Sequence, residues 1–419
     1  MYHIAFMTDT GSQRSLELRF IQIYFWTYWL QNINTTYLNL YLKKASGLTG
    51  TQIGILSSVL FAAGIFLTPL IGLRFDHSRN RPRFLSMLAI LAGASFCAYA
   101  LPVPWYALIP VGVAFACGWL PVVPLTDSLA NTPEVTAASP RGYGGYRRWG
   151  TIGFALAGAL SGWLTGNVGL WSFFPLYVFC ALVVAWYVRG IPGRVAAGPH
   201  QPGSRVPAPR DILDLLKQKN FRRFLGIVLV ASVGGSACYT FRSIYLSSIG
   251  IPDSVIGYMW ALIIPGELVC FTLATKWRER WGAGPLVTAG LVVNGLRWIL
   301  LSFVNVPLLY AVEILHGVGF ALYWPAAVNF VQTEAPPRLR GTAQILFFST
   351  AAGIGNAIGA VVGGRIFDVY GPKPVLWFGG TLFIIGGVMQ ALFVKHAPPR
   401  QPFGEGALGG APSSDVARR

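Results

Sequence analysis

The chain has 419 residues, of which 54% are hydrophobic and 11% are charged. A soluble domain carries about 25% charged residues, and a water-soluble chain of this length with so few charges could not cover its surface. The composition therefore excludes a soluble globular protein and predicts a chain that lipid solvates over most of its area.

The formal net charge of +17 does not indicate a nucleic-acid partner. The basic residues form no single patch but lie in short runs between apolar segments, as in the cytoplasmic loops of membrane proteins. The five cysteines fall inside apolar runs without CxxC spacing, so we expect neither a disulfide framework nor a metal site. No residue pattern requires a cofactor.

Apolar runs long enough to cross a bilayer recur along the whole chain. Such a helix needs about 20 residues, and these runs are far too long for the strands of a barrel. The sequence therefore predicts an all-α membrane protein with twelve transmembrane helices. The predicted spans are 18–42, 52–73, 84–101, 105–131, 148–168, 171–189, 222–248, 254–275, 285–303, 307–331, 342–366 and 374–395.

The lysines and arginines predict the orientation of these spans. If the N-terminus is cytoplasmic, 26 of the 32 lie in cytoplasmic segments and four on the opposite side. Because positive residues are enriched in cytoplasmic loops, this split predicts that both termini are cytoplasmic. We expect a multi-pass protein of the bacterial inner membrane.

The longest loop is rich in Pro, Gly and Arg and divides the predicted spans six and six. A tail rich in Pro, Gly and Ser follows the last span and is expected to be disordered. The predicted units are an N-terminal six-helix half (1–189), a cytoplasmic central loop (190–220), a C-terminal six-helix half (221–395) and a cytoplasmic tail (396–419).

The two halves are similar in sequence. The matching pairs are Gly47 with Gly250, Gly54 with Gly257 and Asp76 with Glu279 at an offset of 203, and Gly158 with Gly359 at an offset of 201. Because both halves begin on the same side, the pattern predicts a parallel repeat about a pseudo-two-fold axis normal to the membrane. This arrangement is typical of transporters that alternate access.

The loop after the second span runs from Gly72 through Asp76 to Arg81 and resembles the G-x-x-x-D-x-x-x-x-[RK] loop of the major facilitator superfamily. Gly72 permits close helix approach, and Asp76 can bind a helix N-terminus or an arginine. We expect a latch that holds the halves in one conformation. The alternative is a basic loop that only fixes topology.

Charged side chains inside a span cost at least ~2.5–3.5 kcal/mol each on insertion scales, so each is a functional hypothesis. One such set lies in spans eight to ten: Glu267, Arg297, Glu313 and His316. A carboxylate in low dielectric prefers its proton, and a nearby arginine favours the anion. Movement of an arginine would therefore load or release a proton, and these four residues are the predicted proton-coupling group. The alternative is a permanent structural network.

The first span is unusually polar, and Tyr28, Gln31 and Thr35 form one helical stripe beside Asn34. We expect these four residues to line a substrate cavity, although polar side chains also hold helices together. Tyr239 and Arg242 in span seven are the corresponding candidates from the other half.

Several segments resemble a known family. Tyr143 to Phe154 is similar to the YGxxRxWGxxGF segment of the phenylpropionate-permease group, a branch of the major facilitator superfamily related to lactose permease and to nucleoside–proton symporters. The segment from Ile256 to Glu267 resembles its IGYLW…E segment, and those at Leu296–Trp298 and Leu315–Phe320 resemble its LRW and LHxxxF segments.

This resemblance implies a proton symporter with a central cavity. It implies that Asp127 and Arg147 form an acid–arginine pair that recognises substrate, and that Arg297 and His316 belong to a proton network. The chain departs from lactose permease at the proton-bearing acid, because Gly319 stands where that permease carries its proton-bearing glutamate.

The sequence thus predicts a secondary transporter, not an enzyme, that carries a small organic solute (an aryl carboxylate, a nucleoside or a sugar-like molecule) by proton-coupled symport. The chain has no Walker A loop, no HExxH and no nucleophile triad. Two alternatives stay open: a proton-driven efflux antiporter for drugs or lipids, and a nutrient sensor without transport. The expected partners are the solute and the lipid bilayer, and we expect a monomer.

Overall fold

The structure is a computed structural model that describes residues 10–139, 142–192, 209–304 and 306–394. All regular secondary structure in these ranges is helical, in agreement with the predicted all-α class. The predicted tail (396–419) and residues 193–208 of the predicted central loop lie outside the described residues.

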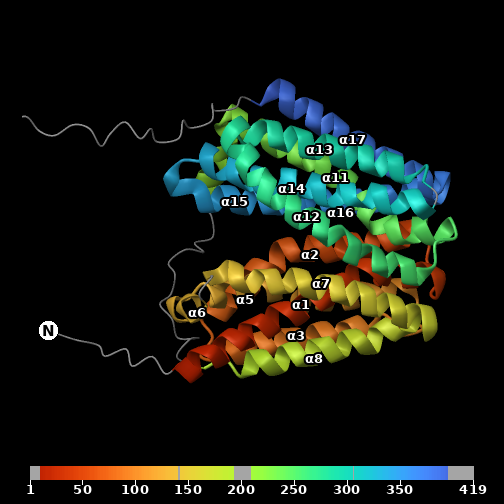
Figure 1. Ribbon diagram of the computed structural model, residues 1–419. Helices are drawn as coiled ribbons and strands as arrows, with labels where there is room; N and C mark the ends of the chain where they lie inside the picture. The colour runs from red at the N-terminus through yellow and green to blue at the C-terminus, as the bar shows by residue number, and fades with distance from the viewer. Residues whose placement is uncertain (1–9, 140–141, 193–208, 305, 395–419) are drawn as a thin grey trace, which may run out of the picture.

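The helices before the central loop pack together into what we call the N-terminal bundle (Figure 1). Within it α1 packs on α7 and α8, and α3 packs on α4 and α8. Its elements are α1 (Thr10–Lys44), α2 (Gly50–Asp76), α3 (Arg81–Ala98), η1 (Trp105–Ala107), α4 (Leu108–Trp119), α5 (Val122–Ala130), α6 (Pro133–Ala138), α7 (Gly142–Asn167), η2 (Leu170–Ser172) and α8 (Phe173–Arg189).

The helices after the loop form the C-terminal bundle (Figure 1). Within it α13 packs on α14 and α17, and α11 packs on α16 and α17. Its elements are α10 (Pro209–Lys217), α11 (Lys219–Ser248), α12 (Asp253–Trp281), α13 (Ala283–Leu301), α14 (Val306–Glu334), η3 (Pro337–Leu339), α15 (Arg340–Phe348), η4 (Ser349–Ile354), α16 (Gly355–Tyr370) and α17 (Pro372–Phe393).

Nine helical segments of the described chain are long and apolar enough to cross a membrane: α2, η1–α5, η2–α8, α11, α12, α13, α14, η3–α16 and α17. Helices α1, α3 and α7 are not among them, because α1 is rich in polar residues, α3 has two arginines in its first turn and α7 has Gly- and Arg-rich first two turns. The chain is therefore a multi-pass membrane protein.

Two of the predicted spans are interrupted. The span expected at 105–131 is broken between α4 and α5, where Pro121 has no backbone N–H to continue the helical ladder. The span expected at 342–366 contains a π-helical turn over Ser349–Ile354, in a stretch of small residues. Such turns are rare and are often found at functional sites.

The two most extensive contacts between the bundles are those of α2 with α16 and of α7 with α12, and α1 also contacts α11. Glycines allow both approaches, since a Cβ on Gly54 would collide with the backbone of Ala360, and one on Gly257 would lie 2.6 Å from the carbonyl oxygen of Gly158. The predicted repeat pair Gly54 and Gly257 thus occupies both interfaces. Gly359 instead packs on α11, where its Cβ would lie 2.9 Å from Ser236.

The hydrogen bonds that join the bundles lie near one end of the molecule, on the right in Figure 1. There the Lys44 ammonium group on α1 lies 2.8 Å from the Asp253 carboxylate on α12. The Asp368 carboxylate on α16 accepts hydrogen bonds from the backbone N–H groups of Gly50 and Thr51 on α2, at 2.6 and 2.7 Å. At the opposite end the ribbons of the two bundles lie further apart (Figure 1).

Candidate functional site

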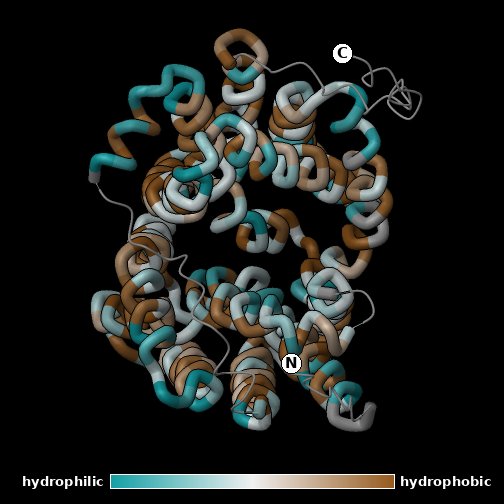
Figure 2. The backbone as a smooth tube through the Cα atoms, turned by 90° about the vertical axis from the view of Figure 1, so that its left-hand side faces the viewer, coloured by the Kyte–Doolittle hydropathy of each residue, from teal (hydrophilic) through white to brown (hydrophobic). Residues whose placement is uncertain are grey.

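A cavity of ≈ 600 Å³ lies between the two bundles, and both contribute side chains to its wall. Figure 2 looks at the molecule from the end where the ribbons of the two bundles diverge, with the two bundles one above the other. Helices α1 and α7 supply one wall, and α11, α12, α13, α14, η4, α16 and α17 supply the other. The volume fits a small organic molecule, because ligand sites measure about 300–1,000 Å³.

The N-terminal wall is polar. Tyr28, Gln31 and Thr35 follow one another on the inner face of α1, as their spacing predicts. Glycine at 150 allows this packing, since a Cβ there would lie 2.7–3.0 Å from the Tyr28 ring. Arg147 on α7 also reaches the cavity and places its guanidinium 5.2 Å from the centre of the Tyr28 ring.

Asp127 on α5 holds Arg147 from behind the cavity wall. Its carboxylate lies 3.6 Å from the Arg147 guanidinium and accepts a hydrogen bond of 2.5 Å from the Tyr24 hydroxyl. The predicted acid–arginine pair is therefore present in the fold, but only its arginine lines the cavity.

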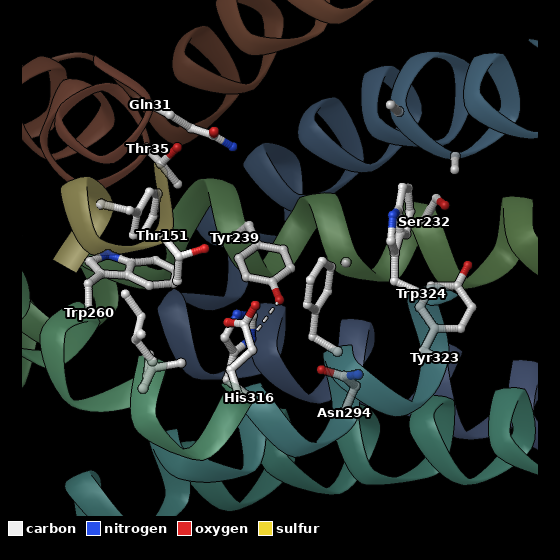
Figure 3. Close-up of a pocket in the computed structure, with 18 of the residues that line it drawn as sticks. Gln31, Thr35, Thr151, Ser232, Tyr239, Trp260, Asn294, His316, Tyr323 and Trp324 are labelled. Carbon is white, nitrogen blue, oxygen red and sulfur yellow. Dashed lines mark hydrogen bonds between the residues drawn. The ribbon is translucent and has the colours of Figure 1, made fainter. Parts of the chain in front are cut away.

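An aromatic ladder runs along the cavity face of α14. His316, Phe320 and Trp324 are spaced four residues apart, and successive rings are 6.1 Å apart with interplanar angles of 17°. All three side chains line the cavity, and Figure 3 shows His316 and Trp324 among them. Aromatic rings in the cavity wall favour contact with a flat solute.

His316 is held by aromatic side chains from two other helices. The Tyr239 hydroxyl on α11 lies 3.0 Å from His316 Nδ1, and the Trp260 ring on α12 meets the imidazole edge-on at 5.6 Å (Figure 3). These contacts fix the orientation of the imidazole at the cavity surface.

A buried triad of charges lies behind this histidine. Glu313 Oε1 is 3.0 Å from Arg242 Nε, and Glu313 Oε2 is 2.6 Å from Arg297 Nη2. The three side chains are at most 2% exposed, and the guanidinium groups also stack on Trp260 and Trp298 at 4.8 and 4.1 Å. One carboxylate thus faces two cations, which leaves an excess of one positive charge.

Glu267 on α12 has a different environment. Its side chain lines the cavity, and no hydrogen bond or ion pair joins its carboxylate to another described residue. Gly317 allows α14 to pack closely against α12 at Glu267, because a Cβ on residue 317 would lie 2.7 Å from the backbone nitrogen of Glu267. A carboxylate without a cationic partner, partly shielded from water, is suited to bind a proton.

The predicted site residues thus separate into two layers. Tyr28, Gln31, Thr35, Arg147, Tyr239, Glu267 and His316 line the cavity. Asn34, Asp127, Arg242, Arg297 and Glu313 do not. Arg242, predicted to contact substrate, instead binds Glu313. The reason is that α11 presents its successive turns to different neighbours, which the sequence alone does not specify.

Eleven further polar and aromatic residues line the cavity that the sequence did not single out as site residues: Thr151, Phe154, Ser232, Trp260, Phe271, Asn294, Phe320, Tyr323, Trp324, Asn356 and Phe383. The spacing of His316, Phe320 and Trp324 along one helix could have indicated the ladder. Asn294 fills the space opposite Gly319, since a Cβ there would lie 2.5 Å from its amide nitrogen. A glutamate at position 319 would therefore displace Asn294.

The predicted latch lies outside the cavity. Arg81 donates a hydrogen bond of 3.2 Å to the backbone carbonyl of Asp76. A Cβ built on Gly72 would meet no other helix of the described residues within 4 Å, so the close helix approach expected at this glycine is not seen in this conformation.

The described residues contain no group of three or more His, Cys, Asp or Glu side chains that could hold a metal ion. A multi-pass helical protein with a solute-sized, partly polar cavity between two bundles belongs to the class of membrane transport proteins. The chain matches the MFS_1 like family over residues 18–378 and belongs to that family of the major facilitator superfamily.

Proteins named as transporters are similar to this chain over nearly their whole length. An uncharacterized transporter of Bacillus subtilis, YwbF, is 26% identical over 372 residues, which cover 86% of this chain and 90% of that protein. A protein of Escherichia coli named "Probable 3-phenylpropionic acid transporter" is 28% identical over 356 residues, or 84% of this chain and 88% of that protein. These relatives and the family are transporters, not enzymes.

A solved structure shares the fold. The crystal structure of the nucleoside transporter NupG superposes with a TM-score of 0.79 at 18% sequence identity and covers 91% of this chain and 100% of that chain. The likeness shows the arrangement of helices, whereas the identity is too low to show a shared solute.

Proposed function

We propose that this protein is a proton-coupled symporter of a small organic solute that works by alternating access. The observation that carries the proposal is the contrast between two acids. Glu267 lines the cavity without a cationic partner among the described residues, whereas Glu313 forms ion pairs with both Arg242 and Arg297. Because two close cations favour the carboxylate anion, Glu267 is the better proton carrier.

The remaining members of the predicted proton-coupling group then act as support. Arg242, Arg297 and Glu313 hold a fixed positive charge one helical turn from His316. His316 lies between this charge and the cavity, and it relays a proton between the solute and the buried triad. The coupling ion is the proton, and no other cofactor is involved.

The cavity chemistry favours a solute with a planar ring. The ladder on α14 offers ring faces, Arg147 offers a cation for a carboxylate, and Gln31, Asn294 and Asn356 offer amides for hydroxyl or base edges. A nucleoside or an aryl carboxylate uses both kinds of surface, and these are also the solutes for which NupG and the E. coli relative are named. A sugar-like solute would use mainly the amides.

The proposal includes a membrane topology and a conformation. Helices α1, α3 and α7 would cross the bilayer with the nine apolar segments, which gives twelve spans in two halves, 1–189 and 221–395, related by a parallel pseudo-two-fold repeat. The excess of lysine and arginine would place both termini in the cytoplasm of a bacterial cell. The Asp368 and Asp253 contacts would then close the outer end, and the cavity would open inwards.

Reconstitution tests the proposal directly. Purified protein is placed in liposomes that hold a pH-sensitive dye, and aryl carboxylates, nucleosides, disaccharides and lipophilic cations are added in turn. We expect a lumenal pH change with a ring-bearing solute and none in empty liposomes. A pH change only with lipophilic cations would favour the efflux antiporter. Solute binding without any flux, in protein shown to be folded, would favour the sensor and overturn the proposal.

A further inference from the structure

A second cavity, of ≈ 530 Å³, lies on the outer face of the N-terminal bundle between the first turns of α1 and the last turn of α8. Arg14, Leu18 and Arg19 line it from α1, and Trp186 and Tyr187 line it from α8. Nine residues of helix separate Arg19 from Tyr28, which is about 13 Å at 1.5 Å per residue. We call this the α1–α8 groove, and it is distinct from the transport cavity.

The α1 side of the groove is basic. No ion pair joins Arg14 or Arg19 to an acidic group among the described residues. Glu17, the acid nearest to them in sequence, lies about 130° around α1 from the centre of the groove-lining face, at 100° per residue. The two guanidinium groups therefore face one space without an anion between them.

Neutral donors lie on the same face. Gln22 Oε1 accepts a hydrogen bond of 2.9 Å from Trp26, which leaves the amide NH₂ of Gln22 as a donor towards the groove. Ser15 adds a hydroxyl. Two guanidinium groups, an amide and a hydroxyl make a set of donors suited to phosphate oxygens.

The rim of the groove is apolar. Leu18 is 53% exposed and Trp186 is 76% exposed, and Tyr187 lies beside them. In a membrane protein, Trp and Tyr near the ends of helices lie at the level of the lipid headgroups. A free phosphate ion would use the donors but not this rim, whereas a phospholipid uses both.

We propose that the α1–α8 groove binds the headgroup of an anionic phospholipid, with the phosphate between Arg14 and Arg19 and the acyl chains along Leu18 and Trp186. Basic pockets at helix ends bind such headgroups by the same chemistry. The site is independent of the proposed transport cycle, so either proposal can fail without the other.

Native mass spectrometry of the purified full-length protein tests the site. The protein is titrated with phosphatidylglycerol or with phosphatidylcholine of the same acyl chains, and the affinity for the first bound lipid is measured. We expect selective binding of phosphatidylglycerol, and a loss of roughly 30-fold in Arg14→Gln/Arg19→Gln at about 1 kcal/mol per arginine. Arg278→Gln/Arg280→Gln, the same change in charge on α12, is the matched control and should retain it.

Two further measurements separate the outcomes. Trp186→Ala removes an exposed side chain without changing charge, and it should weaken phosphatidylglycerol binding as well. Millimolar inorganic phosphate should not displace the lipid. Equal binding by wild type and the double arginine variant would overturn the site, and displacement by phosphate or an unchanged Trp186→Ala would overturn the phospholipid as its ligand.

Discussion

The carboxylate of Asp368 on α16 binds both the backbone N–H and the hydroxyl group of Thr51 on α2. The Asp368 carboxylate accepts a hydrogen bond of 2.7 Å from the Thr51 backbone N–H and one of 2.6 Å from the Thr51 hydroxyl. The first N–H groups of a helix have no intrahelical partner and favour an anion. A residue of the C-terminal bundle thus satisfies the start of a helix in the N-terminal bundle, and this contact stabilises the closed end of the cavity.

We therefore expect Asp368→Asn to open this end more often. The Asp368 side chain is exposed, and an exposed anion at a helix N-terminus contributes about 0.3–1 kcal/mol, so the open population should rise by roughly two- to fivefold. The readout is labelling of Thr35→Cys, which lies in the cavity, by a membrane-impermeant thiol reagent in a background without the native cysteines. Lys44→Gln is the comparison: the Lys44 side chain is 44% exposed, and exposed pairs contribute little. Equal rates for both variants would contradict the assignment.

Glu267→Gln should uncouple solute movement from the proton. The amide cannot bind and release a proton, so we expect exchange of solute down its gradient to persist, while proton-driven accumulation and its dependence on pH disappear. Flux assays in liposomes with and without an imposed pH gradient measure both. Glu279→Gln, the same change further along α12, should accumulate solute like the wild type. Intact accumulation by Glu267→Gln would exclude this residue as the proton carrier.

We expect substitutions in the buried triad to change the free energy of unfolding according to the net charge that they leave buried. Glu313→Gln leaves two buried guanidinium groups without an anion and should cost about 3–5 kcal/mol. Arg242→Met leaves Arg297 and Glu313 as a one-to-one pair, so it should cost much less. Thermal unfolding in detergent compares the two midpoints. A lower midpoint for Arg242→Met would show that the packing of Arg242 on Trp260 outweighs its charge.

Gly317 should tolerate no side chain, because an added Cβ would lie 2.7–3.1 Å from the backbone and Cβ of Glu267. We expect Gly317→Ala to separate α12 from α14 and to lower the transport rate severalfold. Gly226→Ala on α11 is the matched control, since no atom lies within 4 Å of its Cβ position, and alanine there should be neutral or slightly stabilising. If both variants transport alike, Gly317 does not set the position of Glu267.

Phe320→Leu should weaken the binding of a solute that carries a planar ring. The ring stacks between His316 and Trp324 in the cavity wall, and stacking on an aromatic side chain contributes about 1–3 kcal/mol for a nucleic-acid base. We expect the KM for a ring-bearing solute to rise by roughly 5- to 100-fold with little change in kcat. Phe303→Leu, at a position 69% exposed on the outer surface, should leave KM unchanged. An unaltered KM for Phe320→Leu would exclude stacking on the ladder.

The sequence predicted the helices better than the site. Apolar length marks a span whatever its neighbours are, so the helices lie near the predicted ranges. The breaks at Pro121 and at Ser349–Ile354 were missed, because a helix interruption inside an apolar run changes hydropathy very little. The spacing did predict that Tyr28, Gln31 and Thr35 share one face of α1, because helical periodicity does not depend on the tertiary arrangement.

The sequence by itself thus determined that this is a multi-pass helical membrane protein of a transporter family, because composition and short motifs carry that information locally. Only the tertiary structure decided which charges face the solute. Glu267, Glu313 and Arg242 all lie within apolar helices, and their sequence contexts do not distinguish them. The rotation and packing of α11, α12, α13 and α14 join Glu313 to two arginines and leave Glu267 at the cavity, since a side chain's electrostatic environment depends on helices distant in sequence.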